Sequence, residues 1–471
     1  MRIISKLLKL TSISFILLAM ISCSDDDDVV IITPDELNIV ETALETPELS
    51  SLVAALQAAD GDLVAVLNGP GPFTVLAPTN DAFSLFLTAN GFASLDDVPT
   101  DVLSQILLNH VISAEVSSSA LIGIGSGYAD SNATGAGNSP MSLYFDTSNG
   151  VRFNNVSTVT TADVEASNGT IHIVNGVIGL PTIVDHAVAN SDLSSLVSAL
   201  TFGGNTTFTD LLSMPGDFTV FAPTNAAFDA FTNPNSNDID NILSNHVIVG
   251  ATAVSSGLSN GYVSTAGMNG DGDALSLYIN TDSGVTINGI SDVDKADVIA
   301  SNGVIHVVNT VIDLPTVVTF AAADPNFSNL LAALTRSDQP DFAGILSTPD
   351  GTSPAPFTVF APVDTAFEAL LNSNDDWDSL ADIDGMLLTS VLQHHVIVEA
   401  NIRAEDLTDG VMPATLEGDN ITINLPGNDG NAAKITDGSG TSNIDIIAVN
   451  VQANNGVIHA TESVLIPDTT N

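Results

Sequence analysis

The feature that most constrains this chain is an internal repeat whose period is the length of a domain. A segment that begins Phe-Thr-Val, continues through Ala-Pro and ends on a second phenylalanine occurs at residues 73–83, 218–228 and 357–367. Its copies begin 145 and 139 residues apart, whereas solenoid repeats recur about every 20 to 50 residues. The sequence therefore predicts three tandem domains, which also suits a length of 471 residues.

Two further motifs recur in the same order in each copy. A histidine followed by Val-Ile comes first, and an Asn-Gly-x-Ile-His motif followed by a proline comes near the end. The histidines of these motifs are His110 and His172 in the first copy, His246 and His306 in the second, and His395 and His459 in the third. Because the prolines close the copies, the expected domains are residues 36–181, 182–315 and 316–467.

The local patterns predict that helices open each copy. Apolar residues within 49–56 are spaced as i, i+3, i+4 and i+7, which makes one face of an amphipathic helix, and both later copies repeat this spacing. The Phe-Thr-Val segment reads as a strand that Ala-Pro ends. Suitable N-caps for the short helix that follows are Thr79 or Asn80, Thr224 or Asn225, and Asp364.

The Asn-Gly pair predicts a closing hairpin. It is a tight-turn signal, because left-handed backbone geometry costs these residues little. In the first copy it joins two expected strands, over residues 159–166 and 171–178. With helices first and a hairpin last, the expected fold class is α+β.

The N-terminus reads as an export signal. Three basic residues within the first ten precede an apolar run over residues 13–21, which is shorter than the about 20 residues that a membrane-spanning helix needs. The sequence Met-Ile-Ser-Cys that ends at Cys23 resembles the lipobox of bacterial lipoproteins, in which the cysteine becomes the lipidated first residue. We therefore expect residues 1–22 to be a lipoprotein signal peptide and Cys23 to be the lipidation site.

Residues 23–35 are the expected acidic tether. Four consecutive aspartates in this segment resemble the signal that sends some Gram-negative lipoproteins to the outer face of the outer membrane. The same run also suits a solvated, flexible tether. The expected location is the outer membrane, with a lipid anchor in the membrane and the protein facing the cell exterior. Since Cys23 is the only cysteine, no internal disulfide can form.

The charge excludes one class of partner. The chain has 56 acidic residues and 8 basic residues. Nucleic-acid binding requires a basic surface that neutralises phosphates, so no nucleic acid is expected as a partner. The acidic composition suits solubility, high salt, and divalent cations or cationic partners.

Taken together, the three motifs resemble the signature of the fasciclin domain family, and they occur three times in the family's order. The resemblance implies three tandem fasciclin domains, each a wedge-like β-sandwich flanked by helices. It also implies roles in cell adhesion, matrix contact and association with proteins or glycans. The chain departs from the family where a Tyr-His motif is common, because Asn109, Asn245 and His394 replace the tyrosine. It contains no Arg-Gly-Asp tripeptide.

The repeated histidines lack the partners that a catalytic or metal site needs. A zinc site takes Cys and His ligands at fixed spacings, and a catalytic pair needs a second group and a cleft. No nucleophile elbow, phosphate loop or dinucleotide fingerprint occurs. The six motif histidines are therefore expected to be structural, and no catalytic, cofactor-binding or metal-binding residue is predicted.

Two other polar features have alternative interpretations. Asp163 and Asp297 lie nine residues before the motif histidine, where the third copy has Asn450; a turn or packing role tolerates this exchange better than catalysis does. The loop over residues 269–273 places oxygen ligands at alternate positions, as in a calcium loop. It lacks the glycine at position six and the glutamate at position twelve, so weak Ca²⁺ binding is left open and no other cofactor is expected.

The expected function is that of a non-enzymatic adhesion and binding lipoprotein, which mediates cell–cell, matrix or polysaccharide contact through tandem fasciclin domains. Tandem weak sites gain avidity without any single strong site. An alternative is a glycan or polymer capture protein associated with a nutrient-uptake system. A hydrolase is less supported, because the sequence shows no catalytic motif. A purely structural spacer is a further alternative, which would show no binding in assays of the separate copies.

The three copies are not interchangeable. The first two share a Ser-Leu-Tyr sequence whose tyrosines, Tyr144 and Tyr278, are expected to be sheet or core residues. The third copy carries His394, Asn450 and the only tryptophan, Trp377. If one copy has a specialised contact role, the third is the expected one.

Overall fold

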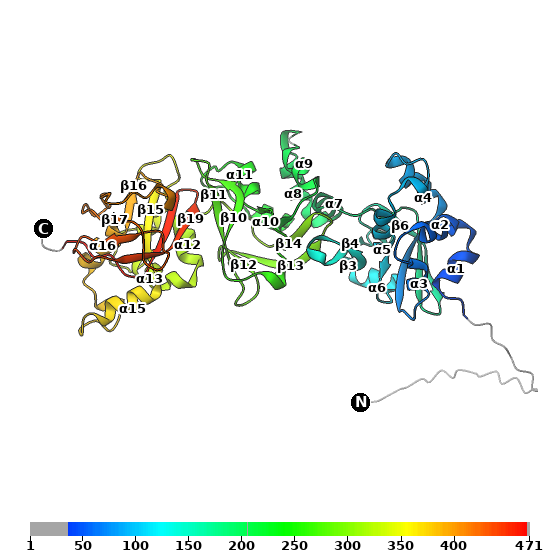
Figure 1. The fold of residues 1–471 in the computed structure, drawn as a ribbon, viewed down its shortest axis with the longest axis horizontal. Helices are drawn as coiled ribbons and strands as arrows, with labels where there is room; N and C mark the ends of the chain where they lie inside the picture. Colours follow the sequence, from blue (N-terminus) through cyan, green and yellow to red (C-terminus); the bar gives the residue numbers. More distant parts are fainter. Residues whose placement is uncertain (1–35, 205, 469–471) are drawn as a thin grey trace, which may run out of the picture. The chain divides into compact units, whose positions relative to one another are not determined.

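The computed structural model describes residues 36–204 and 206–468. The predicted signal peptide (1–22), the predicted lipidation site Cys23 and the predicted tether (23–35) lie outside the described residues. None of the helices that the structure describes is long and apolar enough to span a membrane. Three domains follow one another along the described chain, and each begins with helices and ends with a strand pair (Figure 1).

The first domain contains helices α1 (Ile39–Glu45), α2 (Ser50–Ala58), α3 (Leu63–Leu67), α4 (Asn80–Ala89), α5 (Thr100–Leu108) and α6 (Ser118–Ile124). Its strands are β1 (Phe73–Pro78), β2 (Val111–Ile112), β3 (Ser126–Thr134), β4 (Pro140–Asp146), β5 (Arg152–Phe153), β6 (Ser157–Ala166) and β7 (Gly169–Val174).

The second domain contains helices α7 (Ile183–Ala189), α8 (Ser194–Leu200), α9 (Thr207–Ser213), α10 (Asn225–Ala230) and α11 (Ile239–Ser244). Its strands are β8 (Phe218–Pro223), β9 (Val247–Val249), β10 (Gly261–Met268), β11 (Ala274–Asn280), β12 (Thr286–Ile287), β13 (Ser291–Ile299) and β14 (Gly303–Val308).

The third domain contains helices α12 (Val317–Ala323), α13 (Ser328–Leu334), α14 (Phe342–Leu346), α15 (Asp364–Asn372) and α16 (Gly385–His394). Its strands are β15 (Phe357–Pro362), β16 (Val396–Val398), β17 (Thr422–Asn424), β18 (Lys434–Thr436), β19 (Ile444–Ala453) and β20 (Gly456–Thr461).

Each domain is built around a mixed sheet. The strand order of the first sheet is β2-β1-β7-β6-β5-β4-β3, and the second sheet repeats it. Strands β1 and β7 run parallel, with Leu76 opposite His172, whereas β6 and β7 form the closing antiparallel hairpin. The parallel pair therefore brings the Phe-Thr-Val motif and the Asn-Gly motif side by side. The third sheet has the order β16-β15-β20-β19-β18-β17 and ends without a named counterpart of β3 and β10.

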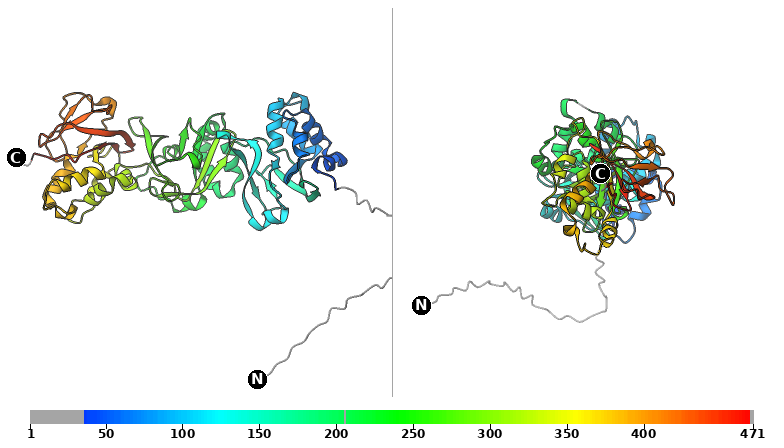
Figure 2. Two further views of the ribbon diagram at one scale, coloured as in Figure 1. Left: turned by 60° about the horizontal axis from the view of Figure 1, so that its bottom comes forward. Right: turned by 90° about the vertical axis from the view of Figure 1, so that its left-hand side faces the viewer.

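The sheet folds over itself to form the expected sandwich. Register shifts between Thr161 and Val164 interrupt the pairing of β6 with β7, and such bulges bend a strand. Leu76 of β1, Leu143 of β4 and Phe153 of β5 consequently belong to one buried cluster. The expected α+β fold, a β-sandwich flanked by helices, is confirmed. In Figure 2, the helices α13 and α15 of the third domain lie to one side of its strands.

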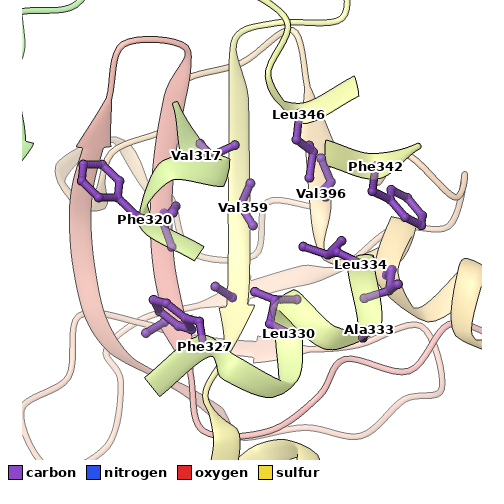
Figure 3. Close-up of a cluster of buried hydrophobic side chains, with 14 of the residues drawn as sticks. Val317, Phe320, Phe327, Leu330, Ala333, Leu334, Phe342, Leu346, Val359 and Val396 are labelled. Carbon is purple, nitrogen blue, oxygen red and sulfur yellow. The ribbon is translucent and has the colours of Figure 1, made fainter. Parts of the chain in front are cut away.

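A second and larger core lies between the helices and the sheet. In the third domain Phe320 of α12, Leu330 of α13 and Val359 of β15 are 0%, 5% and 7% exposed and belong to one cluster, which Figure 3 shows in close-up. The predicted amphipathic helix of the first domain packs in the same way, since Leu52 and Leu56 of α2 are buried. Burial of these apolar side chains is the main favourable contribution to folding.

Two of the three predicted helix caps are observed, and the third is wrong. The hydroxyls of Thr79 and Thr224 accept backbone N–H groups at the starts of α4 and α10. In the third domain the N-cap position of α15 is Val363, which makes no side-chain cap. Asp364 lies in the first turn of the helix and accepts the backbone N–H of Asn329, 2.8 Å away at the start of α13, as Asn80 and Asn225 do for Ser51 and Ser195.

The closing hairpin forms where the Asn-Gly pair predicts it, but its second arm ends at Val174 and not at residue 178. The glycine serves another purpose than a left-handed turn. Gly169 has a φ of 152°, and a Cβ there would lie 2.0 Å from the carbonyl oxygen of Phe73. Glycine is required because the backbone of β1 passes directly against it.

Candidate functional site

The histidine that precedes Val-Ile is buried and held by two backbone groups. His110 is 1% exposed; its Nδ1 donates to the carbonyl of Ile106 at 2.7 Å, and its Nε2 accepts the N–H of Ile178 at 2.9 Å. His246 and His395 make the same two bonds, at 2.7 to 2.9 Å. Because the bond at Nε2 comes from an N–H donor, the ring proton lies on Nδ1. The ring ties the end of a helix to the segment that follows the hairpin.

Burial keeps these rings uncharged. It lowers the pKa of His110, His246 and His395 to about 4, and the carbonyl that each ring contacts only partly opposes this shift. All three histidines are therefore neutral at pH 7, with both ring nitrogens engaged. A general base needs a free nitrogen within reach of substrate, so this arrangement supports a structural role.

The histidine of the Asn-Gly motif is also tied to the backbone. His172 donates from Nε2 to the carbonyl of Val116 at 2.9 Å, and its Nδ1 accepts the N–H of Asp163 at 3.2 Å. His306 makes the equivalent pair of bonds. His459 keeps the first bond, while its Nδ1 finds no partner among the described residues. Burial lowers the pKa of His306 and His459, so these rings too are neutral.

The aspartate that precedes this histidine fixes a turn. The carboxylate of Asp163 accepts the backbone N–H and the hydroxyl of Ser118, at 2.8 and 2.5 Å, and the second domain repeats this arrangement. In the third domain Asn450 accepts the N–H of Ala404 and donates to Glu405, each at 2.8 Å. The exchange of aspartate for asparagine thus accompanies the loss of the serine hydroxyl.

The asparagine of the Asn-Gly motif is a clamp that sequence reasoning missed. The side-chain oxygen of Asn168 accepts the N–H of Ile39 at 3.0 Å, and its amide nitrogen donates to the carbonyls of Leu67 and Gly69 at 2.8 Å. Asn302 and Asn455 make the equivalent three bonds. The only signal in the sequence was that this asparagine recurs in all three copies.

His394 gives the third domain a polar site that the other two lack. Its Nδ1 lies 3.5 Å from a carboxylate oxygen of Glu417 and 3.3 Å from the hydroxyl of Thr415. Burial lowers its pKa, and the nearby carboxylates, Glu417 first, oppose that shift. Asn109, the equivalent residue of the first domain, uses its amide to bind a backbone carbonyl and Ser131.

The loop with calcium-like spacing turns its carboxylates toward the third domain. Asp273 lies 3.5 Å from Nε of Arg403, and Asn401 donates to Asp273 at 3.1 Å and to Asp271 at 3.3 Å. Within residues 36–204 and 206–468, no group of three or more His, Cys, Asp or Glu side chains is arranged to hold a metal ion.

Paired tyrosines lie where one domain contacts the next. Tyr144 and Tyr278 are each 3% exposed, and their rings contact those of Tyr128 and Tyr262, with centroids 5.2 and 4.9 Å apart. The ring of Tyr262 also packs edge-on against Phe320, the core residue of α12 in the third domain. Tyr144 and Tyr278 are core residues, as the sequence predicts. Tyr128 and Tyr262 are half-buried and pack against the core of the following domain.

Hydrogen bonds accompany these rings. The hydroxyl of Tyr262 donates to the carboxylate of Asp324 at 2.9 Å, whereas Tyr128 accepts from the amide of Asn190 at 3.2 Å. In addition, the hydroxyl oxygen of Ser276 accepts the backbone N–H of a residue in β19, 2.9 Å away. The repeated polar residues therefore make hydrogen bonds inside domains or between them.

Comparisons with known proteins agree with this organisation. A model of the fasciclin domain matches residues 47–181, 191–315 and 325–467. A protein of Synechocystis sp. is 39% identical over 146 residues, which are 31% of this chain and 75% of that protein. Transforming growth factor-beta-induced protein ig-h3 of Oryctolagus cuniculus is 25% identical over 91% of this chain, which spans 58% of that protein. The solved FAS1 domain pair of the insect cell adhesion molecule fasciclin I is 21% identical, with a TM-score of 0.39, and covers 59% of this chain and 97% of that structure.

Proposed function

The chain belongs to the fasciclin domain family, and we propose that it is a non-enzymatic adhesion and binding protein of the cell surface. In this proposal the lipid on Cys23 anchors it in the outer membrane, and its domains face the cell exterior. Its partner is a surface protein or a polysaccharide. Proteins with fasciclin domains are associated with cell adhesion. The proposal applies this general role to a lipid-anchored protein of the outer membrane.

One observation carries the proposal. Every motif histidine is bonded to the backbone through a carbonyl, and the carboxylates beside them hold turns. A catalytic site requires a nucleophile or base that faces a cleft, and the motif histidines face the protein interior. Three similar domains with different surfaces suit a binding protein instead, because linked weak sites add avidity.

The charge narrows the kind of partner. With 56 acidic and 8 basic residues, the chain repels other strongly acidic surfaces over about one Debye length, roughly 8 Å at physiological salt. A neutral polysaccharide or a protein with a basic patch fits this charge. We propose that no cofactor takes part. The weak Ca²⁺ site left open at residues 269–273 would have to compete with Arg403 for Asp273.

The test compares cells that carry the natural chain, a chain with Cys23→Ser, and no chain. Adhesion predicts that loss of the chain reduces aggregation or biofilm formation, and that Cys23→Ser, which leaves the three domains unchanged, does the same. A growth defect on one polymer with normal aggregation would instead support capture of a glycan for uptake. Thermal unfolding of the purified chain with and without Ca²⁺ tests the calcium site, and an unchanged unfolding temperature excludes it.

A further inference from the structure

The third domain departs from the other two at the edge of its sandwich. In the first two domains the long strands β3 and β10 cover this edge, and Ala129 and Val263 from these strands pack against the sandwich core. In the described third domain, the irregular segment 410–415 stands in their place, joined to residues 419–423 by backbone hydrogen bonds and by a bridge between Ala414 and Asn420. The core cluster beneath it stays buried, but its cover on this side is an irregular segment and not a long strand.

A cavity of about 370 Å³ lies at this edge. Its lining includes Phe360 of β15, Ile397 of β16, Ile423 of β17, and Leu407, Val411 and Pro413 from the segment between β16 and β17. Phe360 and Ile423 are each 1% exposed, so the floor of the cavity is the sandwich core itself. Small-molecule sites have volumes of about 300 to 1,000 Å³ and mostly apolar linings. By contrast, the cavities beneath the helices of the three domains measure 20 to 30 Å³, which is room for about one water molecule.

The polar side chains around the cavity determine which charge the polar end of a ligand can carry. Asp406 and Thr408 are exposed residues of its lining. Asn401 is already engaged, because its amide donates to Asp273 and accepts from Gln452. None of the described side chains that line the cavity is basic, so a carboxylate or phosphate would meet the charge of Asp406 without a counter-ion. The nearby Arg403 is neutralised by Glu405, whose pKa it lowers to about 2.

We propose that the third domain binds a small apolar group with a cationic or hydroxyl end in this cavity. The apolar part contacts Phe360, Leu407 and Ile423, and the polar end lies at the rim near Asp406. This inference does not depend on the proposed adhesion function, since it concerns one domain and a small ligand. Adhesion through Cys23 can fail while the cavity binds its ligand, and the reverse also holds.

The experiment uses the full chain and three probes that share one apolar body: 4-phenylbutylamine, 4-phenylbutanol and 4-phenylbutyrate. Binding is followed by ligand-observed NMR titration. We expect the amine and the alcohol to bind, and the carboxylate to bind at least tenfold more weakly because of Asp406. Equal binding of all three probes would overturn the proposal.

Two variants test whether the ligand binds in the cavity. Thr408→Trp and Val411→Trp each add a large ring at the rim, where both residues are exposed and tolerate it. The matched control is Ile122→Trp, which changes the corresponding position of the first domain and is 60% exposed in the natural chain. We expect either rim variant to weaken amine binding at least tenfold, and the control to leave it unchanged. If one rim variant fails to fold, the other still tests the proposal. Unchanged amine binding in a folded rim variant would contradict it.

Discussion

Asn450 donates a hydrogen bond to Glu405 over 2.8 Å in the third domain, at the place where the first two domains pair an aspartate with a serine hydroxyl. The aspartate and the serine change together: Asn450 stands in place of the aspartate, and Ala404, whose backbone N–H binds Asn450, stands in place of the serine. The constant feature is that the side chain accepts one backbone N–H, which either a carboxylate or an amide can do. A role that needed a charged carboxylate would not survive the exchange, so the position fixes a turn.

The first prediction reverses this exchange. Asn450→Asp should destabilise the third domain by about 1–2 kcal/mol, because it replaces a donor by a carboxylate that faces Glu405. Adding Ala404→Ser should restore most of the loss, since the pair then matches Asp163 and Ser118. Urea unfolding followed by the fluorescence of Trp377, which packs against the core of the third domain, measures both. Additive effects of the two substitutions would show that the residues are not coupled.

The second prediction concerns the dependence of stability on pH. His395 has a pKa of about 4 in the folded chain, lowered by burial from 6.5. As the pH falls below 6.5, the unfolded chain takes up a proton that the folded chain does not. Stability is therefore complete above pH 6.5 and is lost between pH 6.5 and 4, by on the order of 3 kcal/mol.

His395→Gln tests this pH dependence. We expect the variant to be less stable than the natural chain at pH 7.5, because one or both backbone bonds are lost, but to lose less stability on acidification to pH 4.5. Trp377 fluorescence in urea reports the third domain at each pH. His394 is present in both proteins, so its own proton uptake contributes to both pH profiles. Parallel pH profiles of the two proteins would contradict the prediction.

The sequence predicted the parts of the fold that depend on local pattern. The three domains, the amphipathic helix over residues 49–56 and the closing hairpin follow from spacings within a few residues. The expectation that the histidines are structural followed from the absence of catalytic partners in the sequence, and it stays a prediction. Each of these features depends on residues close together in the sequence, so it can be predicted without knowing which distant segments are in contact.

What the sequence did not reveal depends on contacts between distant segments. Asn168 binds Ile39, 129 residues away, so its clamping role was invisible until the fold brought them together. Asp364 was predicted to cap the helix that begins beside it in the sequence. Its carboxylate instead accepts the backbone N–H of Asn329 in α13. The loop at 269–273 resembles a calcium loop in the spacing of its oxygen-bearing side chains. The sequence could not show that Asp273 contacts Arg403, because Arg403 lies in another domain.

The third prediction tests the asparagine clamp. Asn455 is 1% exposed and binds the N–H of Val317 and the carbonyls of Leu346 and Thr348. Asn455→Ala should destabilise the third domain by about 3–5 kcal/mol, because it removes three bonds and leaves buried backbone groups unpaired. Asn372→Ala, at the exposed end of α15, is the control and should change stability by less than about 0.5 kcal/mol. Equal effects of the two substitutions in urea unfolding would rule out the clamp.

The fourth prediction compares the contribution to stability of the two tyrosine hydrogen bonds between domains. Tyr262 donates to the carboxylate of Asp324, which is 6% exposed, whereas Tyr128 accepts a hydrogen bond from the neutral amide of Asn190. Bonds to charged groups contribute about 1.5–3 kcal/mol and neutral ones about 1. Tyr262→Phe should therefore lower the stability reported by Trp377 by about 2 kcal/mol, since Asp324 belongs to the third domain.

Tyr128→Phe is the matched control, because it removes a hydroxyl from the equivalent ring at the contact between the first and second domains. It should leave the Trp377 transition unchanged. The double variant Tyr262→Phe with Asp324→Asn should recover part of the loss, because an amide at this position no longer leaves a buried charge short of a donor. If Tyr128→Phe shifted the Trp377 transition as much as Tyr262→Phe does, the stability of the third domain would not depend on its own contact with Tyr262.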